Sequence, residues 1–466
     1  MRRISLSLAL GLALAATSAR AGVTFEYLYA YGYPNSVSSD GNAIAGNSTL
    51  YAPYRWTQSG GVQDLGRSPT PSPGGSPGIS ADGTHVASTI ITSDSTASAS
   101  GLWTQDSGWQ QLMPPNGPPN LGLIDRNYSD VWGLSGDGNT VVGLYWLNTG
   151  RAHGFSWTQA GGGVDLGSRA RSSRANGVSY DGSVIAGWDE NPTTGIRQPA
   201  AWIHGSLSVL CDSTGLGEAQ TVNASGSIVA GFQLNPATTV RECARWLRSG
   251  DSWSATQFLG SVPGTEGDGY GINVAEGISA DGKMIVGYCS FDGSPFSTTG
   301  FVWTQDAGIM DVITFLNANG VAVDPGFLIQ SCQCVTPDGT CIIGFGQDLV
   351  SPYTRRTFRI RITPTASVET PKLPSKLALA APSPNPSRLG ARLGFSLPAA
   401  DQVECSIFDS AGRRIANLAH GWFPAGQHSL AWDGRDLDGR LVAGGVYWAV
   451  VSSSKERASQ RVVRLN

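Results

Sequence analysis

The sequence predicts an all-β chain: a seven-bladed β-propeller followed by a small β-sandwich. Three observations carry this prediction. A nonapeptide recurs seven times, an aromatic residue follows each copy in phase, and the pattern changes after residue 376. The seven nonapeptides begin at residues 38, 80, 135, 179, 223, 279 and 336. A repeating unit of about 40–50 residues is typical of a propeller, in which each unit supplies four short strands.

Each nonapeptide is expected to form a β-hairpin. Its third and fourth residues are Asp-Gly in six copies, and Ser225-Gly226 replaces them in the fifth. Such a pair favours a tight turn, because the turn needs positive φ at its central positions. A single apolar residue precedes each copy, and a short β-branched run such as Val141-Val142 follows the turn. Both segments are too short for helices, so they are expected to be the first two strands of a unit, with the turn as scaffold.

An aromatic residue follows the third residue of each copy by 16 to 22 positions. It marks the third strand, and a Gly-rich turn then leads to a fourth strand that ends in sequences such as Asp165-Leu166-Gly167. Because one Trp side chain buries ~150–250 Å², we expect these residues to pack between neighbouring blades. These structural residues are Trp56, Trp103, Trp157, Trp202, Trp246, Trp303 and Phe358.

The first and last parts of the propeller are expected to meet. The seventh repeat supplies only three strands, ending at residues 356–362, whereas the segment 23–28 stands before the first repeat without a blade of its own. If this segment is the fourth strand of the last blade, the ring closes and two exposed strand edges disappear. The propeller is therefore expected over residues 22–362.

Residues 1–21 are expected to be a secretory signal peptide. Arg2-Arg3 precedes an apolar stretch from Ile4 to Ala16, and Ala19-Arg20-Ala21 has the small residues of a cleavage site. The apolar stretch is too short to span a bilayer, so the mature chain is expected to lack a transmembrane segment. We expect the chain to be exported, extracellular or on the outer cell surface. A net charge of −4 with 14% charged residues argues against nucleic acid as a partner.

The seven cysteines leave two alternatives open. Cys334 and Cys341 flank the seventh turn, so a disulfide across that hairpin is one, and burial as small apolar side chains is the other. A zinc site is not expected, because neither a second closely spaced Cys pair nor a His pair accompanies Cys332 and Cys334. The sequence indicates no cofactor and no metal.

The pattern changes after residues 363–376, which are rich in Pro, Thr and Ser and are expected to be a linker. Residues 377–466 contain alternating runs separated by Gly turns, which predicts a β-sandwich. Four motifs stand at residues 384–386 (PNP), 409–413 (D-x-x-G-R), 432–439 (W-D-G-x-D-x-x-G) and 445–447 (G-x-Y).

These four motifs resemble the immunoglobulin-like domain of the flagellar hook-capping protein FlgD, and also the type A C-terminal sorting domains of the type IX secretion system. The resemblance implies an immunoglobulin-like fold and a role in sorting through the secretion machinery or in attachment. Arg461 and Arg464 stand where the sorting type usually has lysines.

Residues 154–187 carry a second resemblance. They contain an aromatic strand, a Gly turn, Asp165-Leu166-Gly167 and a nonapeptide, in the order typical of the HAF family of probable extracellular repeats. This resemblance implies an exported repeat protein and does not imply an activity.

Catalytic signatures are absent from the sequence. It has no G-x-S-x-G, H-E-x-x-H, Walker or dinucleotide-binding motif. Asp436-Leu437-Asp438-Gly439 begins like a calcium loop but lacks the bidentate Glu, which favours a polar turn. The sequence thus favours a non-catalytic binding protein for adhesion or recognition over an enzyme. Two alternatives stay open, an extracellular carbohydrate-active hydrolase or lyase and a structural component of the cell surface.

Candidate ligand-binding residues are expected in the loops between the second and third strands. These loops vary in length and contain aromatic and acidic residues, and variable loops on a rigid scaffold often bind ligands. Exposed aromatic rings could stack on sugars or fill pockets of a partner protein, although they could also merely cap blade edges. An extracellular glycan or protein is the expected ligand. The candidates are Trp146, Trp188, Asp189, Glu190, Phe232, Tyr288 and Tyr353.

Overall fold

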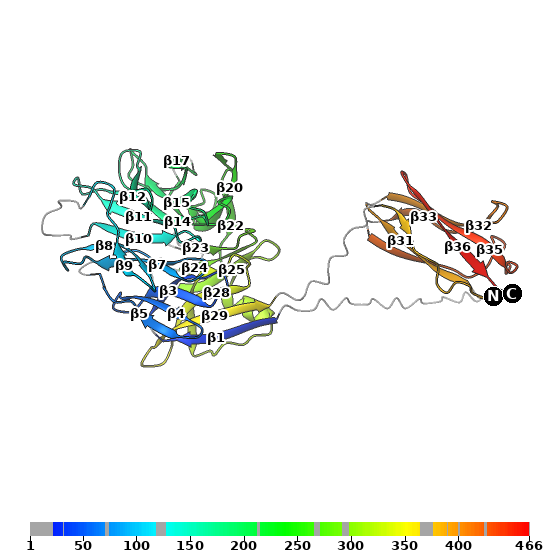
Figure 1. Cartoon of the computed structure of the whole chain (residues 1–466), viewed down its shortest axis with the longest axis horizontal. Helices are drawn as coiled ribbons and strands as arrows, with labels where there is room; N and C mark the ends of the chain where they lie inside the picture. The colour runs from blue at the N-terminus through cyan, green and yellow to red at the C-terminus, as the bar shows by residue number, and fades with distance from the viewer. Residues whose placement is uncertain are drawn as a thin grey trace, which may run out of the picture. The chain divides into compact units, whose positions relative to one another are not determined.

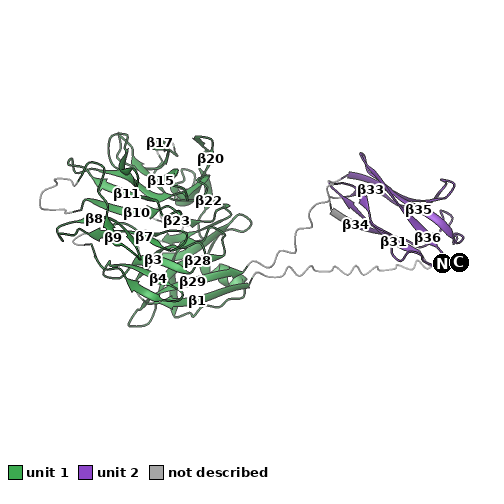
Figure 2. Ribbon diagram, viewed as in Figure 1, with its two compact units in different colours: residues 1–364 green, residues 365–466 purple. Residues whose placement is uncertain are grey.

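In the computed structural model, the regular secondary structure of the described residues consists of β-strands and one short helix (Figure 1). It describes residues 22–30, 32–69, 74–117, 127–211, 215–264, 271–290, 298–363, 376–388, 390–398, 401–423 and 426–465. The predicted signal peptide and nearly all of the predicted linker lie outside these ranges. The chain divides into two compact units, residues 1–364 and residues 365–466 (Figure 2).

Unit 1 contains seven successive groups of antiparallel strands. The first group is β2 (Tyr33–Val37), β3 (Ala43–Asn47), β4 (Pro53–Thr57) and β5 (Gly61–Asp64). The second is β6 (Gly78–Ile79), β7 (His85–Ile91), β8 (Ser98–Thr104) and β9 (Gly108–Gln111). The third is β10 (Ser129–Leu134), β11 (Thr140–Trp146), β12 (Ala152–Thr158) and β13 (Gly162–Gly167). The fourth is β14 (Ser173–Val178), β15 (Val184–Glu190), β16 (Arg197–Ile203) and β17 (Ser206–Val209).

The remaining groups contain one join and one strand from the start of the chain. The fifth is β18 (Gly217–Val222), β19 (Ile228–Leu234), β20 (Arg241–Ser249) and β22 (Gln257–Gly260), with β21 (Ser252–Trp253) beside β20. The sixth is β23 (Ile272–Ile278), β24 (Met284–Ser290), β25 (Thr298–Thr304) and β26 (Gly308–Asp311), followed by the helix α1 (Val312–Ala318). A parallel pair, Arg241 with Ile272, joins the fifth and sixth groups into one sheet. The seventh is β27 (Phe327–Val335), β28 (Cys341–Asp348), β29 (Arg355–Thr363) and β1 (Gly22–Tyr29).

Each nonapeptide connects the first and second strands of its group by a tight turn, as predicted. The turn glycines have φ between +67° and +76°. In the fourth copy, the Asp181 carboxylate accepts hydrogen bonds from the Ser183 hydroxyl and backbone N–H, and these bonds hold the pKa of Asp181 below its usual value. Asp181 also accepts from the Ser179 hydroxyl, at 2.8 Å. The repeated Asp and Ser residues therefore form their hydrogen bonds within the turn.

The last residue of the nonapeptide is Gly in six copies, because the second strand passes very close to the first there. A Cβ placed on Gly143 or on Gly187 would lie 1.9 Å from a carbonyl oxygen of the first strand, that of Asp130 or of Arg174. The same contact at the other four glycines would be 1.9–2.1 Å. Only a residue without a side chain fits this approach in these six copies; in the second copy Ser88 stands at this position.

All seven predicted aromatic residues are buried, with exposed fractions of 6% or less. Each belongs to a hydrophobic cluster that also contains residues from the second strand of the preceding group. Trp202, for example, shares a cluster with Val142 of β11, and Trp246 shares one with Val184 of β15. The seven clusters contain Trp56, Trp103, Trp157, Trp202, Trp246, Trp303 and Phe358, one in each.

The segment 23–28 pairs with the last group, which confirms its predicted place. β1 lies antiparallel to β29, with Phe25 opposite Ile360, and the Phe25 ring stacks on that of Phe358 at 5.3 Å between centroids. Arg359 is buried and connects three parts of the chain. It donates to Glu26 of β1 at 2.7 Å and to the Gly41 carbonyl of the first turn at 2.9 Å.

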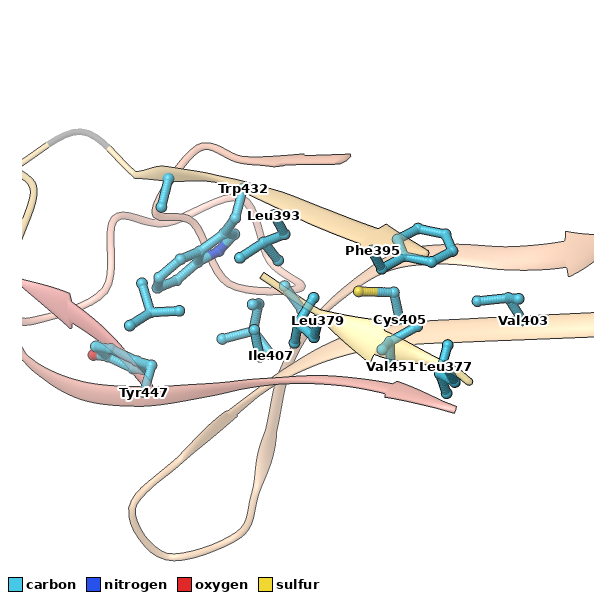
Figure 3. Close-up of a cluster of buried hydrophobic side chains, with 14 of the residues drawn as sticks. Leu377, Leu379, Leu393, Phe395, Val403, Cys405, Ile407, Trp432, Tyr447 and Val451 are labelled. Carbon is cyan, nitrogen blue, oxygen red and sulfur yellow. The ribbon is translucent and has the colours of Figure 1, made fainter. Parts of the chain in front are cut away.

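Unit 2 is built from two sheets that enclose one hydrophobic core (Figure 3). One sheet is β30 (Ala378–Leu379), β31 (Ala391–Leu397) and β34 (Gly426–Trp432), and the other is β33 (Arg414–Phe423), β32 (Asp401–Asp409), β35 (Gly445–Ser452) and β36 (Arg457–Arg464). Trp432 and Tyr447 face each other across the sheets, at 5.3 Å between ring centroids. Asn385, from the PNP motif, binds the backbone of β36 through both its amide nitrogen and its oxygen. The motifs of this region thus hold its strands together.

All seven cysteines are free thiols, so the alternative of a bridge between Cys334 and Cys341 is wrong. Six of the seven are buried, and Cys211 is half-buried. They pack as small apolar side chains. Cys334 and Cys341 belong to the cluster that joins the seventh group to Trp56 of the first. Among the residues that the structure describes, no helix is long and apolar enough to cross a membrane.

Candidate functional site

A cavity of about 440 Å³ lies among the first strands of all seven groups. At each group, the lining includes residues of the first strand or just before it, together with the second residue of the nonapeptide. The cavity is therefore central to unit 1. Its volume lies in the range that small-molecule sites usually have.

The third residue before each nonapeptide lines the cavity, and we call these seven residues the bulge ring. In six groups this residue is the extra residue of a β-bulge, so it has no partner opposite it in the next strand. A bulge redirects a side chain away from the regular alternation of the strand. The bulge ring is mostly polar and consists of Asn35, Pro77, Trp132, Asn176, Gln220, Glu276 and Gln333.

The second residue of each nonapeptide also lines the cavity, and we call these seven residues the rim. Backbone hydrogen bonds connect neighbouring rim turns, for example from Ser39 N–H to the Ala81 oxygen at 2.8 Å. The rim residues are Ser39, Ala81, Gly136, Tyr180, Ala224, Ala280 and Pro337. Six are small or Pro. Tyr180 alone is a large aromatic residue and is 48% exposed, and its ring occupies the space that a Cβ on Gly136 would need.

Arg174 crosses three groups at the cavity wall. It belongs to β14, in the fourth group, and its side chain reaches both neighbouring groups. The guanidinium lies 3.7 Å from the ring centroid of Trp132, in the third group, and Nη2 donates to Glu218 of the fifth group at 2.9 Å. Nε donates to Asn176 at 2.6 Å. Burial lowers the pKa of Arg174 to about 10, while Glu218 opposes that shift, so the side chain stays cationic at neutral pH.

Glu218 is shared by two arginines. Its side chain is only 10% exposed, and it accepts from Arg174 at 2.9 Å and from Arg197 of β16 at 2.8 Å. The Arg197 guanidinium also lies 4.4 Å from the ring centroid of Trp188. Arg197 does not line the cavity and is 47% exposed. One carboxylate thus neutralises only one of the two adjacent cations.

Glu276, the bulge residue of β23, faces the cavity. Its side chain is half-buried because it borders the cavity, and it has no hydrogen-bond or ion-pair partner within the described residues. Removal from bulk water raises the pKa of Glu276 to about 8; nearby Glu218 adds to this shift and Arg174 opposes it. The same burial, together with Glu276 and Glu218, raises the pKa of Tyr288, which also lines the cavity. The cavity wall therefore presents a cation, a carboxyl group that holds a proton near neutrality, and a phenol.

A further carboxyl group, Asp130 of β10, lies near Arg174 but does not line the cavity. It is buried and accepts from the Asn127 amide at 2.8 Å. Burial raises the pKa of Asp130 to about 6. Over the described ranges of the chain, no group of three or more His, Cys, Asp or Glu side chains could hold a metal ion.

Six of the seven predicted binding residues belong to second strands rather than to loops, and that part of the prediction is wrong. Three of the six are buried. Trp188 and Asp189 belong to β15 and Phe232 belongs to β19, with exposed fractions of 4%, 0% and 8%. In six of the seven groups the second strand continues three or four residues beyond the nonapeptide, so the polar and aromatic residues there belong to the strand. The Asp189 carboxylate accepts from Arg169 Nε at 2.5 Å, and the Trp188 ring contacts the Arg197 guanidinium.

The other four candidates are dispersed. Trp146 is the last residue of β11, and Glu190, at the end of β15, accepts from the Ser172 N–H at 3.2 Å. Tyr353 is 58% exposed, between β28 and β29. Tyr288, which directly follows its nonapeptide in β24 as Trp188 does in β15, is the candidate that lines the cavity. The structure thus brings Tyr288 to the charged residues at the cavity and leaves Trp146, Glu190 and Tyr353 elsewhere.

The bulge ring, Arg174 and Tyr180 are absent from the residues predicted from the sequence. A signal for them exists in the repeat. The third residue before each nonapeptide varies between Asn, Pro, Trp, Gln and Glu while its neighbours stay small or apolar. Tyr180 is likewise the one large residue at the second position of seven aligned copies. Positions that vary inside an otherwise regular repeat mark side chains that do not carry the packing.

Together, the two units define an all-β protein with a propeller-like part and an immunoglobulin-like part. Residues 388–457 match the family model of the FlgD Ig-like domain. No curated protein matches the chain.

Several solved structures are similar to the chain. TolB from Acinetobacter baumannii is 13% identical, with a TM-score of 0.40, over 59% of this chain and 64% of that one, so the chain spans slightly less than two thirds of its length. A putative TolB from Agrobacterium tumefaciens is 13% identical, with a TM-score of 0.38, over 74% and 99%. The β-propeller domain of the Trilobed protease from Pyrococcus furiosus is 10% identical, with a TM-score of 0.43, over 72% and 95%. At these identities the likeness concerns the fold alone.

Proposed function

We propose that the chain is a secreted or cell-surface binding protein without catalytic activity, in which unit 1 is a closed seven-bladed propeller of HAF-like repeats. In this proposal the central cavity binds an extracellular ligand, and unit 2 serves sorting or attachment. The observation that carries the proposal is the bulge ring. It places seven side chains around one cavity without using them for strand pairing.

The closed seven-bladed arrangement is supported by the hydrophobic clusters. Six of them join consecutive groups from the first to the seventh. A seventh cluster joins the last group to the first, through Ile343, Cys341 and Trp56. The pairing of β1 with β29 gives the last group its fourth strand. Groups that each bury two faces in this way favour a ring, because an open array would expose one face at each end.

Ligand binding in the cavity is supported by its chemistry. Pockets that bind small molecules combine apolar or aromatic walls with a few polar groups that fix orientation. Here Trp132 and Tyr288 supply the aromatic part, and amide side chains of the bulge ring supply donors and acceptors. None of the bulge-ring residues belongs to a hydrophobic cluster of unit 1. Trp132 and Asn176 also contact Arg174, and the Asn176 amide donates to the Ala219 carbonyl, whereas Glu276 has no such partner among the described residues.

The first prediction tests the location of the site. The mature chain, residues 22–466, is applied to a glycan array, and every ligand found is titrated calorimetrically. We expect Gln220→Trp to weaken binding at least about tenfold by filling the cavity, since Trp132 shows that the bulge ring accommodates this side chain. Gln63→Trp makes the same change on β5, outside the cavity, and is expected to bind like the parent chain.

The same titration separates the cavity from the loops proposed by sequence. Loss of binding in Trp146→Ala together with normal binding in Gln220→Trp would place the ligand at the loops between second and third strands and contradict the cavity site. Absence of any ligand on the array would favour the alternative of a structural surface component.

One observation favours a second candidate function, an extracellular carbohydrate-active hydrolase or lyase. Glu276 holds a proton near neutral pH, whereas Glu218 is ion-paired with two arginines. Glu218 does not line the cavity, whereas Glu276 does, and a carboxyl group that holds its proton near neutral pH is suited to act as a general acid. If an array ligand is cleaved on prolonged incubation, and Glu276→Gln abolishes cleavage while retaining binding, the protein is an enzyme and the non-catalytic proposal is wrong.

The role proposed for unit 2 rests on the family match and on its separate core. Its buried residues, from Leu377 to Val462, form one cluster within the unit. We predict that a chain without residues 377–466 keeps unit 1 folded and able to bind ligand, but is retained in the periplasm or lost to the medium. Cell fractionation and the thermal unfolding of the shortened chain measure the two parts. Normal delivery of the shortened chain to the surface would contradict the sorting role, and its unfolding would contradict the independence of the units.

A further inference from the structure

We infer that the cavity binds the carboxylate of a sugar acid, with Arg174 as the residue that receives the carboxylate and Glu276 as a hydrogen-bond donor beside it. This inference rests on the proposed function and specifies its ligand class. Four observations carry it: a free edge of a guanidinium, a cation as the charged group of the cavity lining, an unpaired carboxyl group and amide side chains in the wall.

The guanidinium of Arg174 has one edge available to a ligand. Nε and Nη2 donate to Asn176 and Glu218, whereas Nη1 has no acceptor in the described part of the chain. Arg174 lines the cavity, and its position is fixed by the Trp132 ring at 3.7 Å. A fixed, partly desolvated guanidinium with a spare donor is well suited to a carboxylate, because charge-assisted hydrogen bonds are the stronger ones and little side-chain freedom is lost.

The charges of the cavity lining also favour an anion. Arg174 and Arg197 share the Glu218 carboxylate, and Asp130, with a pKa of about 6, is a second carboxylate near Arg174. Neither Glu218 nor Asp130 lines the cavity, whereas Arg174 does. Glu276, which also lines it, holds its proton near neutral pH. The charged group that a ligand in the cavity meets at neutral pH is therefore a cation.

Glu276 has the position of a donor to that anion. It faces the cavity as a bulge residue, and no group in the described residues pairs with it. In its protonated form a carboxyl group can donate one hydrogen bond, whereas the ionised form would repel a carboxylate. Binding of the anion and protonation of Glu276 therefore support each other.

The remaining walls indicate the rest of the ligand. Gln220 and Gln333 line the cavity and each donate one amide N–H to the protein, to Glu218 and to Ser331, which leaves a second N–H and the amide oxygen for hydroxyl groups of a ligand. Both amide atoms of Asn176 are bonded to the protein, to Arg174 and to the Ala219 carbonyl. Tyr180 exposes an aromatic ring at the rim, where it can pack against the apolar face of a sugar ring. A carboxylate with several hydroxyl groups on a ring matches these walls, and a sugar acid has that composition.

The groups that face Glu276 allow a clear pH test. Arg174 keeps its charge well above neutral pH, because its pKa is about 10. Burial raises the pKa values of Tyr288 and of the Cys334 thiol above their usual range, so both stay neutral. Glu218 also lies near Glu276 and forms ion pairs with Arg174 and Arg197. Glu276 is thus the facing group whose charge changes between about pH 7 and about pH 9.

The sign follows from the raised pKa. Below about pH 8 Glu276 is mostly protonated and supports the anion; above it the ionised carboxylate opposes the anion. Affinity for a sugar acid is therefore expected to fall by about tenfold from about pH 7 to about pH 9, the change that follows from uptake of one proton on binding. Affinity for a neutral ligand would not follow this course.

The experiment is calorimetric titration of the mature chain with galacturonate and glucuronate, and with galactose and glucose as their neutral counterparts. We expect the acids to bind at least about tenfold more tightly than the neutral sugars at neutral pH. N-acetylalanine is included as a carboxylate without a sugar ring. Equal binding of N-acetylalanine would overturn the sugar part of the assignment, and equal binding of the neutral sugars would overturn the carboxylate.

Three variants assign the residues. Arg174→Gln should weaken binding of the acids at least about tenfold, while Arg197→Gln, which removes the same charge and another bond to Glu218, should weaken it less than about threefold. Glu276→Gln should bind at neutral pH and lose the dependence between about pH 7 and about pH 9. A retained pH dependence in Glu276→Gln, or equal losses in the two arginine variants, would overturn the residue roles. If neither acid binds, the inference is wrong, whereas the proposed function stands or falls by the array and the Gln220→Trp variant.

Discussion

Replacing Trp202 by Ala is expected to lower the free energy of unfolding of unit 1 by ~3–5 kcal/mol. The Trp202 side chain is fully buried, and its Nε1 donates to the Leu166 carbonyl at 2.9 Å. The substitution removes a large ring from the cluster that holds the third and fourth groups together, and it leaves the Leu166 oxygen without its donor. Both losses act at an interface between groups, where the neighbouring strands cannot collapse fully into the space.

Denaturant unfolding of the purified chain, followed by fluorescence and by circular dichroism, measures this loss. Leu50→Ala is the matched control, since Leu50 is a large apolar residue of the same unit that is 80% exposed. It should change stability by less than ~0.5 kcal/mol. A loss below ~1 kcal/mol in Trp202→Ala would mean that the aromatic residues do not carry the packing between groups.

Glu218→Gln is expected to have a comparable effect for an electrostatic reason. The substitution keeps the shape of the side chain but leaves Arg174, whose side chain is 12% exposed, without its carboxylate. Removing one member of a buried ion pair typically costs ~3–5 kcal/mol, because the remaining charge is desolvated and unpaired. Arg197 loses the same partner but is 47% exposed and can return to water. Most of the loss should therefore come from Arg174.

Thermal and denaturant unfolding at neutral pH test this prediction. Glu190→Gln is the control: Glu190 lies 3.8 Å from Arg171, and both side chains are partly exposed, so the loss should be ~0–1 kcal/mol. Equal effects of the two substitutions would show that Glu218 is not a buried counter-ion. Added salt should change the loss of unfolding free energy in Glu218→Gln only slightly, because buried charges are screened little.

The fold of unit 1 was largely predictable because its repeat encodes strands and packing together. The Asp-Gly turns set the hairpins, and the aromatic positions set the contacts between groups, as Trp246 and Phe358 confirm. The place of the segment 23–28 was also predictable, because the seventh repeat lacks a fourth strand and an unpaired edge is unfavourable. These predictions depend on local pattern and on satisfaction of backbone groups, both of which are visible in a sequence.

The candidate site was much less predictable. Trp188 and Phe232 directly follow a nonapeptide, where the sequence predicted a loop, but the second strands continue through them. Their aromatic side chains are buried, whereas the variable length of these segments between repeats indicated exposed loops. Glu276 and Trp132 were missed for a different reason. Their orientation depends on a bulge, which shifts one residue out of the alternation that a sequence pattern assumes.

A side chain that a bulge places outside the regular alternation can change without altering the pairing of the strand that carries it. Asn, Trp, Gln and Glu occupy this one position in different copies of the repeat. The packing between groups and the lining of the cavity are thus encoded at separate positions within each repeat. Under the proposed function, single substitutions at the bulge position would change ligand recognition one repeat at a time and leave the packing between groups in place.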